Sequence, residues 1–207
     1  MLGLVAVAAA LTDWWAVWQD RIDVEQRAKP ATIAALIGFV LLRGGDVVVA
    51  LLIAIALGFS VVGDLFLLPR LDRFIEGLAA FFAAHVVYLV AFLVVGADFE
   101  RTVLAYAAVM GFAVLVGRYI VAAATLEDER LGLAVVAYIM VLTAVVAVAV
   151  GTNVLLIGVG AALFAASDGF LGWHRFVRTL PQGRLITHML YHLGQALFAV
   201  GALTLSS

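Results

Sequence analysis

Two aspartates stand within long apolar stretches, where an ionisable side chain is costly and seldom without a role. Asp64 lies in the run 47–68 and Asp168 in the run 153–173. Two carboxyl groups in a dry site can differ in protonation, because one keeps its proton while a donor such as Lys29 or a histidine ionises the other. That division makes an acid/base pair. We therefore predict that Asp64 and Asp168 are catalytic.

A histidine and a tyrosine follow each aspartate at nearly the same spacing. Both segments read Asp-x-Phe-Leu and then His-x-x-Tyr; the residues are Asp64, His85 and Tyr88 in the first, and Asp168, His188 and Tyr191 in the second. The two copies are half a chain apart, which predicts a parallel repeat of two four-helix halves with the Asp/His pairs facing each other across the bundle. Chance similarity among abundant Phe and Leu residues is the alternative.

Other polar groups in the apolar runs have two interpretations. Asp13, His188 and His192 share the cost of the aspartates and are candidates for function on that ground alone. Each could instead link helices, as could the hydroxyl group of Ser167 bonded to a neighbouring group. For Asp13 and His192 both interpretations stay open.

A metal centre is one rival to carboxylate chemistry. His188 and His192 have the i, i+4 spacing of ligands on one helix face, and together with His85 and the aspartates they could bind zinc. No compact ligand motif accompanies them. The chain has no cysteine, which excludes thiolate ligands, thiol nucleophiles and disulfides. We predict neither a metal nor a cofactor.

The elements that position these residues must lie in lipid. Of 207 residues 66% are hydrophobic and 13% charged, and the mean hydropathy is +1.19. Too little polar surface exists to cover a water-soluble particle. The net charge is only −2 and no Lys/Arg-rich run occurs, so nothing indicates nucleic-acid binding. Membrane lipid is the predicted partner.

The fold class predicted is an all-α, polytopic membrane bundle. A helix needs about 20 apolar residues to cross the hydrocarbon core, and the apolar runs indicate about eight such helices. We expect one transmembrane domain over residues 1–207, with no soluble domain. The runs are 2–18, 30–42, 47–68, 74–95, 102–124, 131–150, 153–173 and 185–205.

Basic residues orient the bundle. The odd-numbered connections hold Arg21, Arg27, Lys29, Arg70, Arg73, Arg118, Arg130, Arg175, Arg178 and Arg184, whereas the opposite face holds only Arg43 and Arg101. The positive-inside rule places the odd connections in the cytoplasm and both termini on the far side of the cell membrane. The candidate site then faces the cytoplasmic half. Arg175, Arg178 and Arg184 could hold a phosphate head group, although topology alone predicts arginines there.

Five motifs in order resemble the YhhN/lysoplasmalogenase family of eight-span membrane proteins. They cover nearly the whole chain: Lys29-Pro30 at the predicted start of the second helix, Gly63-Asp64, Gly77-x3-Phe81-x3-His85-x2-Tyr88, Gly160-Ala161-x2-Phe164-x2-Ser167-Asp168, and Tyr191-x3-Gln195. The resemblance implies hydrolysis of the vinyl ether bond of a lysophospholipid, the lysoplasmalogen, to a fatty aldehyde and a glycerophospho-alcohol. It extends to neither His188 nor His192, which are predicted from burial alone.

A vinyl ether is cleaved by protonation of its β-carbon, addition of water to the oxocarbenium ion and collapse of the hemiacetal. One carboxylic acid and one carboxylate suit these steps, as in glycoside hydrolysis. The residues predicted as catalytic are Asp64, Asp168, His85, Tyr88 and Ser167, and those predicted to bind substrate are Lys29, Tyr138, Tyr191, Gln195, His188 and His192. Which aspartate is the acid stays open at this point.

Other functions are also compatible with these residues. A proton-coupled transporter or channel would use buried Asp and His groups and internal repeats. Against it, the polar residues gather in the cytoplasmic half and leave the outer half apolar. A metal-dependent lipid hydrolase and a lipid-binding scaffold without turnover are the remaining alternatives.

Overall fold

The computed structural model describes residues 1–43 and 45–204, and over this part the chain forms eight α-helices and one π-helical turn. The predicted all-α class is confirmed; the predicted end of the last run at residue 205 lies outside the described residues. The elements are α1 (Leu2–Trp18), α2 (Ile22–Arg43), α3 (Val47–Phe66), α4 (Phe74–Val95), α5 (Phe99–Glu127), α6 (Glu129–Gly151), α7 (Leu155–Gly172), η1 (Trp173–Val177) and α8 (Gly183–Leu203).

Five stretches in the described part of the chain are long and apolar enough to cross a membrane. They are α3, α4, α5, α6 and the continuous stretch Leu155–Val177, which joins α7 to η1. The remaining helices are shorter or less apolar. Helix α1 has only 17 residues, and α2 and α8 contain polar side chains such as Lys29 and His188. The chain is a multi-pass membrane protein.

The second helix corrects the sequence prediction. It begins at Ile22 and not at Pro30. The charged residues Glu25, Arg27 and Lys29 lower the hydropathy of its first two turns, and for this reason the apolar run starts only at Pro30. A proline inside a membrane helix is tolerated where neighbouring groups satisfy the freed carbonyl group. Glu25 and Lys29 are buried in the bundle. Lys29 therefore projects from the body of α2 and does not open it.

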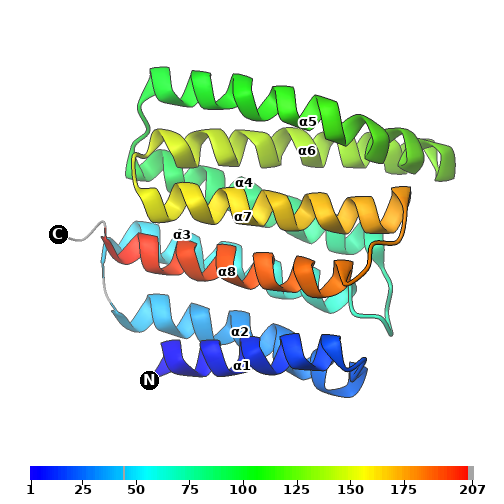
Figure 1. Ribbon diagram of the computed structural model, residues 1–207. Coiled ribbons are helices and arrows are strands. Elements are labelled where there is room, and N and C mark those ends of the chain that lie inside the picture. Colours follow the sequence, from blue (N-terminus) through cyan, green and yellow to red (C-terminus); the bar gives the residue numbers. More distant parts are fainter. Residues whose placement is uncertain (44, 205–207) are drawn as a thin grey trace.

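Consecutive helices pack as hairpins: α1 with α2, α3 with α4, α5 with α6, and α7 with α8. Figure 1 shows that α1 begins and α8 ends at the same end of the bundle, while α5 lies along one edge beside α6. Helix α8 also contacts α1, α2 and α3, which explains why its many polar residues are buried. The internal repeat stays a prediction; α4 packs on α6 as α8 packs on α2, the relation that such a repeat requires.

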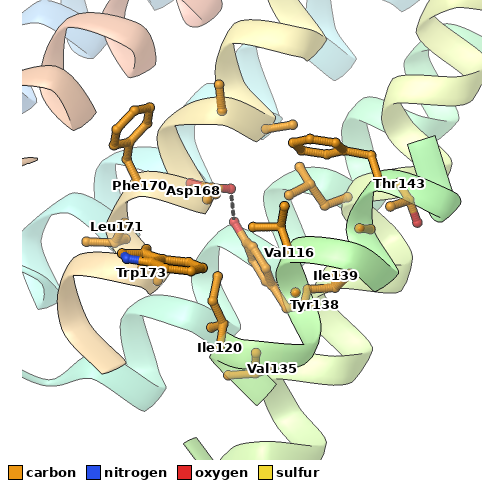
Figure 2. Close-up of a pocket in the computed structure, with 18 of the residues that line it drawn as sticks. Val116, Ile120, Val135, Tyr138, Ile139, Thr143, Asp168, Phe170, Leu171 and Trp173 are labelled. Atoms are coloured by element: carbon orange, nitrogen blue, oxygen red, sulfur yellow. Dashed lines mark hydrogen bonds between the residues drawn. The ribbon is translucent and has the colours of Figure 1, made fainter. Parts of the chain in front are cut away.

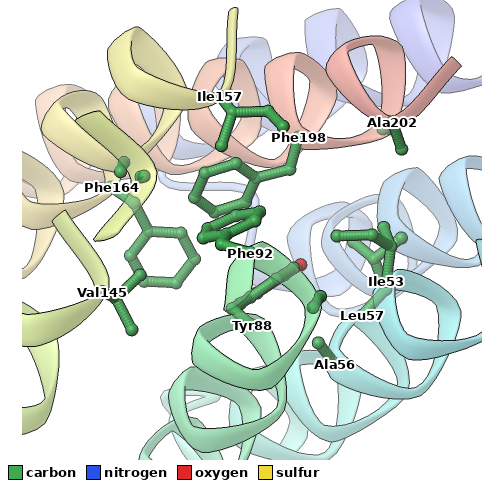
Figure 3. Close-up of a cluster of buried hydrophobic side chains, with 14 of the residues drawn as sticks. Ile53, Ala56, Leu57, Tyr88, Phe92, Val145, Ile157, Phe164, Phe198 and Ala202 are labelled. Atoms are coloured by element: carbon green, nitrogen blue, oxygen red, sulfur yellow. The ribbon is translucent and has the colours of Figure 1, made fainter. Parts of the chain in front are cut away.

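Two features fix α7, the helix that carries Asp168, against its neighbours. A Cβ atom at Gly194 of α8 would lie 2.9 Å from the carbonyl oxygen of Gly160 on α7, so these glycines permit the close approach typical of membrane helices. An aromatic cluster then fills the core between α4, α7 and α8 (Figure 3). Its members Tyr88, Phe92, Phe164 and Phe198 are at most 1% exposed.

Candidate active site

Asp64 is fully buried near the end of α3 and contacts two donors. The ammonium nitrogen Nζ of Lys29 lies 3.0 Å from Oδ1, and the hydroxyl group of Tyr191 donates to Oδ2 over 2.7 Å. Lys29 also lies 5.4 Å from the centre of the Tyr191 ring, in a cation–π contact. A buried charge needs a partner of opposite sign, and the ammonium group of Lys29 is that partner for Asp64.

Asp168, near the end of α7, has different neighbours. The hydroxyl group of Tyr138 donates to Oδ2 over 2.6 Å, as Figure 2 shows. Nε2 of His85 lies 4.0 Å from the same oxygen, beyond hydrogen-bond distance. Nδ1 of His85 lies 2.7 Å from the carbonyl oxygen of Phe81; a proton donated there leaves a neutral ring with its lone pair on Nε2.

No lysine or arginine within residues 1–43 and 45–204 forms an ion pair with Asp168. A carboxyl group that is buried without a cation is most stable when it keeps its proton. The two aspartates thus have the unlike surroundings that separate an acid from a carboxylate.

Asp64 and Asp168 line one polar chamber of about 100 Å³. A buried water molecule needs a cavity volume of roughly 10–15 Å³, so the chamber has room for several water molecules. Both aspartates therefore belong to the wall of one space with room for water, and Asp64 itself has no exposed surface there. Other polar side chains in its wall are Glu25, Lys29, Ser167, His174, Arg184, Thr187, His188 and Tyr191.

A second, larger cavity lies beside the chamber. This apolar groove has a volume of about 700 Å³ and is bounded by α4, α5, α6, α7 and η1. Figure 2 shows its wall, with Val116, Ile120 and Ile139 around the Asp168–Tyr138 hydrogen bond. Its size is that of a site for a small ligand, and its lining suits a hydrocarbon.

Asp168 belongs to the walls of both cavities, and so do Leu67, Phe81 and Leu171. A molecule that extends from the groove into the chamber would cross the wall that these four residues share, Asp168 among them. This geometry suits an amphiphile with an apolar chain, a polar end and a reactive bond between the two.

Further charged groups lie between the chamber and α1. The guanidinium group of Arg184 donates to both oxygens of Glu25, over 2.8 and 2.6 Å. Nδ1 of His188 lies 2.7 Å from Oδ2 of Asp13. Arg184 was a candidate for a phosphate head group, but it is already paired. Sequence reasoning missed Glu25; its place one helical turn before Lys29 on α2 was the available signal.

The structure separates Tyr88 and Gln195 from the two carboxyl groups. Tyr88 donates to the side-chain oxygen of Gln195, whose nitrogen Nε2 donates to Oγ of Ser60 over 3.0 Å. The Tyr88 ring lies in the aromatic cluster (Figure 3), and neither residue lines the chamber. Their hydrogen bonds join α3, α4 and α8, so their burial has a structural explanation.

Ser167 and His192 also serve contacts between helices. Oγ of Ser167 donates to the carbonyl oxygen of Thr187 over 2.9 Å. His192 accepts a hydrogen bond at Nδ1 from the indole of Trp14 over 3.0 Å and does not line the chamber. Ser167 does line it, but with its proton already committed to a backbone carbonyl group.

In the described part of the chain, no group of three or more His, Asp or Glu side chains is arranged to hold a metal ion. His188 and His192 have ring centres 6.3 Å apart, with planes at 76°. Asp13 is paired with His188 and Asp64 with Lys29, so each of these carboxyl groups already has a partner within the protein.

Comparisons with known proteins identify relatives. The YhhN family matches residues 25–202 of the chain. A protein of Rattus norvegicus named lysoplasmalogenase TMEM86B is 35% identical over 153 residues, which cover 72% of this chain and 60% of that protein. Its namesake in Homo sapiens is 32% identical over 151 residues, covering 72% and 62%. The chain thus spans less than two thirds of these relatives. No solved structure matches it.

Proposed function

The chain belongs to the YhhN family, and from that premise we propose that it hydrolyses the vinyl ether bond of lysoplasmalogens. The products are a fatty aldehyde and a glycerophospho-alcohol. Relatives named lysoplasmalogenase support this proposal, as does a buried carboxyl pair beside an apolar groove.

One observation carries the proposal: Asp168 lies in the wall shared by the groove and the chamber. In a lysoplasmalogen the vinyl ether stands where the hydrocarbon chain meets the glycerol group. With the chain in the groove and the glycerol end at the chamber, the double bond lies beside Asp168. A substrate with two chains would need a second apolar site next to the chamber.

Asp168 is the proposed acid. It has a tyrosine hydroxyl group as neighbour and no ion pair with lysine or arginine in the described residues, so it can hold the proton that the β-carbon of the vinyl ether receives. Tyr138 fixes the carboxyl group through Oδ2 and stabilises the carboxylate left after transfer. General acids of this kind contribute about 10²–10⁴-fold to rate.

Asp64 is the proposed electrostatic partner. Its carboxylate, held by Lys29 and Tyr191, faces the chamber in which the oxocarbenium ion forms. A fixed negative charge in a site of low dielectric stabilises a developing positive charge. Lys29 and Tyr191 then act by positioning Asp64, in place of the substrate-binding roles predicted for them.

We also propose that residues 1–207 form one transmembrane domain whose chamber opens towards the cytoplasm. The connection between α3 and α4, next to the chamber, contains Arg70 and Arg73, whereas Arg43 and Arg101 lie at the other end. Because the chain has no cysteine, single substitutions Leu71→Cys and Leu155→Cys can report topology. An impermeant thiol reagent outside intact cells should label only Leu155→Cys; labelling of Leu71→Cys alone would reverse the orientation.

The activity is tested with purified protein in lipid–detergent micelles. A lysoplasmalogen and its saturated ether analogue are incubated separately, and aldehyde and glycerophospho-alcohol are measured. We expect both products from the vinyl ether and neither from the analogue. Absence of aldehyde from folded protein would reject the proposed activity, and release of an alcohol from both lipids would indicate a different bond specificity.

A further inference from the structure

Asp13 and His188 form a buried pair at the edge of the chamber. Oδ2 of Asp13, on α1, lies 2.7 Å from Nδ1 of His188, on α8, and Asp13 is completely buried. A carboxylate that accepts the Nδ1 proton of a histidine fixes the tautomer and leaves a lone pair on Nε2. The same arrangement orients the base in many hydrolases.

The free nitrogen of His188 is available to the chamber. His188 is part of the chamber wall together with Asp64 and Asp168. Within the described chain Nε2 makes no hydrogen bond; the nearest acidic oxygen is Oε1 of Glu25, at 3.8 Å. That carboxylate is already held by both bonds from Arg184.

The other groups that face the chamber are less suited to take a proton. Both oxygens of Asp64 are engaged, one by the ammonium group of Lys29 and the other by the hydroxyl group of Tyr191. Asp168 is a carboxylate after it has protonated the substrate, but Tyr138 already donates to its Oδ2, and in the proposed reaction it recovers its proton later, from the hemiacetal. Nε2 of His85 lies 4.0 Å from Asp168, but His85 is part of neither the chamber wall nor the groove wall.

We propose that His188, positioned by Asp13, is the base that removes a proton from the attacking water. This inference rests on the proposed function and adds a catalytic residue to it. Besides the pair itself, the charged and titratable groups at the chamber or beside the pair are Glu25 and Lys29 from α2, Asp64 from α3, Asp168 from α7, His174 from η1, and Arg184, Tyr191 and His192 from α8.

The proton transfers balance over one turnover. Asp168 gives its proton to the β-carbon, and the vinyl ether becomes an oxocarbenium ion. A water molecule adds to the cationic carbon and passes one of its protons to Nε2 of His188. The addition gives the hemiacetal. The bond between that carbon and the glycerol oxygen then breaks; the oxygen takes the proton from His188, and the hemiacetal hydroxyl group returns a proton to Asp168.

The base acts after carbon protonation, so its loss has a specific signature in heavy water. Without assisted hydration, the oxocarbenium ion returns a proton to Asp168, and deuterium is left on the β-carbon of the recovered substrate. The experiment compares wild-type protein with His188→Asn, which retains a donor towards Asp13 but has no base. Aldehyde release and deuterium in unreacted lysoplasmalogen are measured together by mass spectrometry.

We expect wild-type protein to release aldehyde with little deuterium in the remaining substrate. His188→Asn should release aldehyde at least about 100-fold more slowly while deuterium enters the substrate at close to the wild-type turnover rate. Asp168→Asn should lose both signals. His188→Gln serves as a second variant, and thermal unfolding shows whether each protein is folded.

Asp13→Asn tests positioning. An amide nitrogen facing Nδ1 favours the tautomer with its proton on Nε2, so this variant should also show exchange without release. Wild-type rates of release in folded His188 variants, or equal losses of release and exchange, would overturn the proposal. Absence of aldehyde from wild-type protein would instead reject the hydrolase activity itself, so the two failures are distinguishable.

Discussion

Lys29 of α2 and Asp64 of α3 form an ion pair of 3.0 Å, with the lysine side chain 11% exposed and the aspartate not exposed at all. Each residue is the reason that the other can stay charged inside the bundle. The net worth of such a pair to stability is small, but loss of one partner leaves an uncompensated charge.

Lys29→Met should therefore be strongly destabilising. Removal of one member of a buried pair costs about 3–5 kcal/mol, and we expect a clear drop in the unfolding midpoint in mixed micelles. The double variant Lys29→Met/Asp64→Asn should recover most of the loss, because no charge remains unpaired. If the double variant is as unstable as the sum of the two single changes, the residues are not coupled.

Asp168→Asn should abolish aldehyde release from lysoplasmalogen while the protein stays folded. The amide cannot donate a proton to carbon, and the loss should be about 100-fold or more. Asp72→Asn is the matched control, because Asp72 lies in the exposed connection after α3 and asparagine tolerates its positive φ of 45°. Near-normal turnover of Asp168→Asn would remove this residue from the acid role.

The two tyrosines of the predicted repeat should respond differently to loss of the hydroxyl group. Tyr191→Phe removes the donor to Asp64 and should lower turnover roughly tenfold or more. Tyr88→Phe leaves Gln195 without one partner and should cost about 1–3 kcal/mol of stability with little change in turnover of the folded fraction. The reverse pattern would show that Tyr88 belongs to the reactive site.

Val116→Trp should shorten the hydrocarbon chain that the groove accepts. Val116 lies in the groove wall (Figure 2), and each methylene group that is denied burial forfeits about 0.8 kcal/mol. The KM for long-chain lysoplasmalogens should rise more than that for short-chain ones. Val114→Trp makes the same change at a residue of α5 that is 58% exposed and is not part of the groove wall. This variant should keep the chain-length preference of the wild type.

Much of the fold could be predicted because lipid imposes a simple rule on helix length and polarity. The runs 2–18 and 74–95 match the ends of α1 and α4. The same rule failed for α2, because hydropathy treats Glu25 and Lys29 as signs of a connection. In the structure each is buried with a partner of opposite charge, and partners from distant helices are invisible to a window along the chain.

The site was predictable in part for a related reason. The cost of burying a carboxyl group pointed to Asp64 and Asp168, which do share a chamber. Tyr88 carries the same sequence signature as Tyr191, yet it contacts Gln195. Whether a tyrosine meets a carboxylate or an amide depends on the rotation of its helix, which the spacing of one sequence does not determine.

The wall that the groove and the chamber share also bears on the fate of the products once the bond is cleaved. In the proposed reaction the aldehyde, which carries the hydrocarbon chain, would be left on the groove side of Asp168. The phosphorylated alcohol would be left on the side of the polar chamber. A single partition would thus send the two halves of one lipid into different phases, so that neither product has to cross the path by which the other departs.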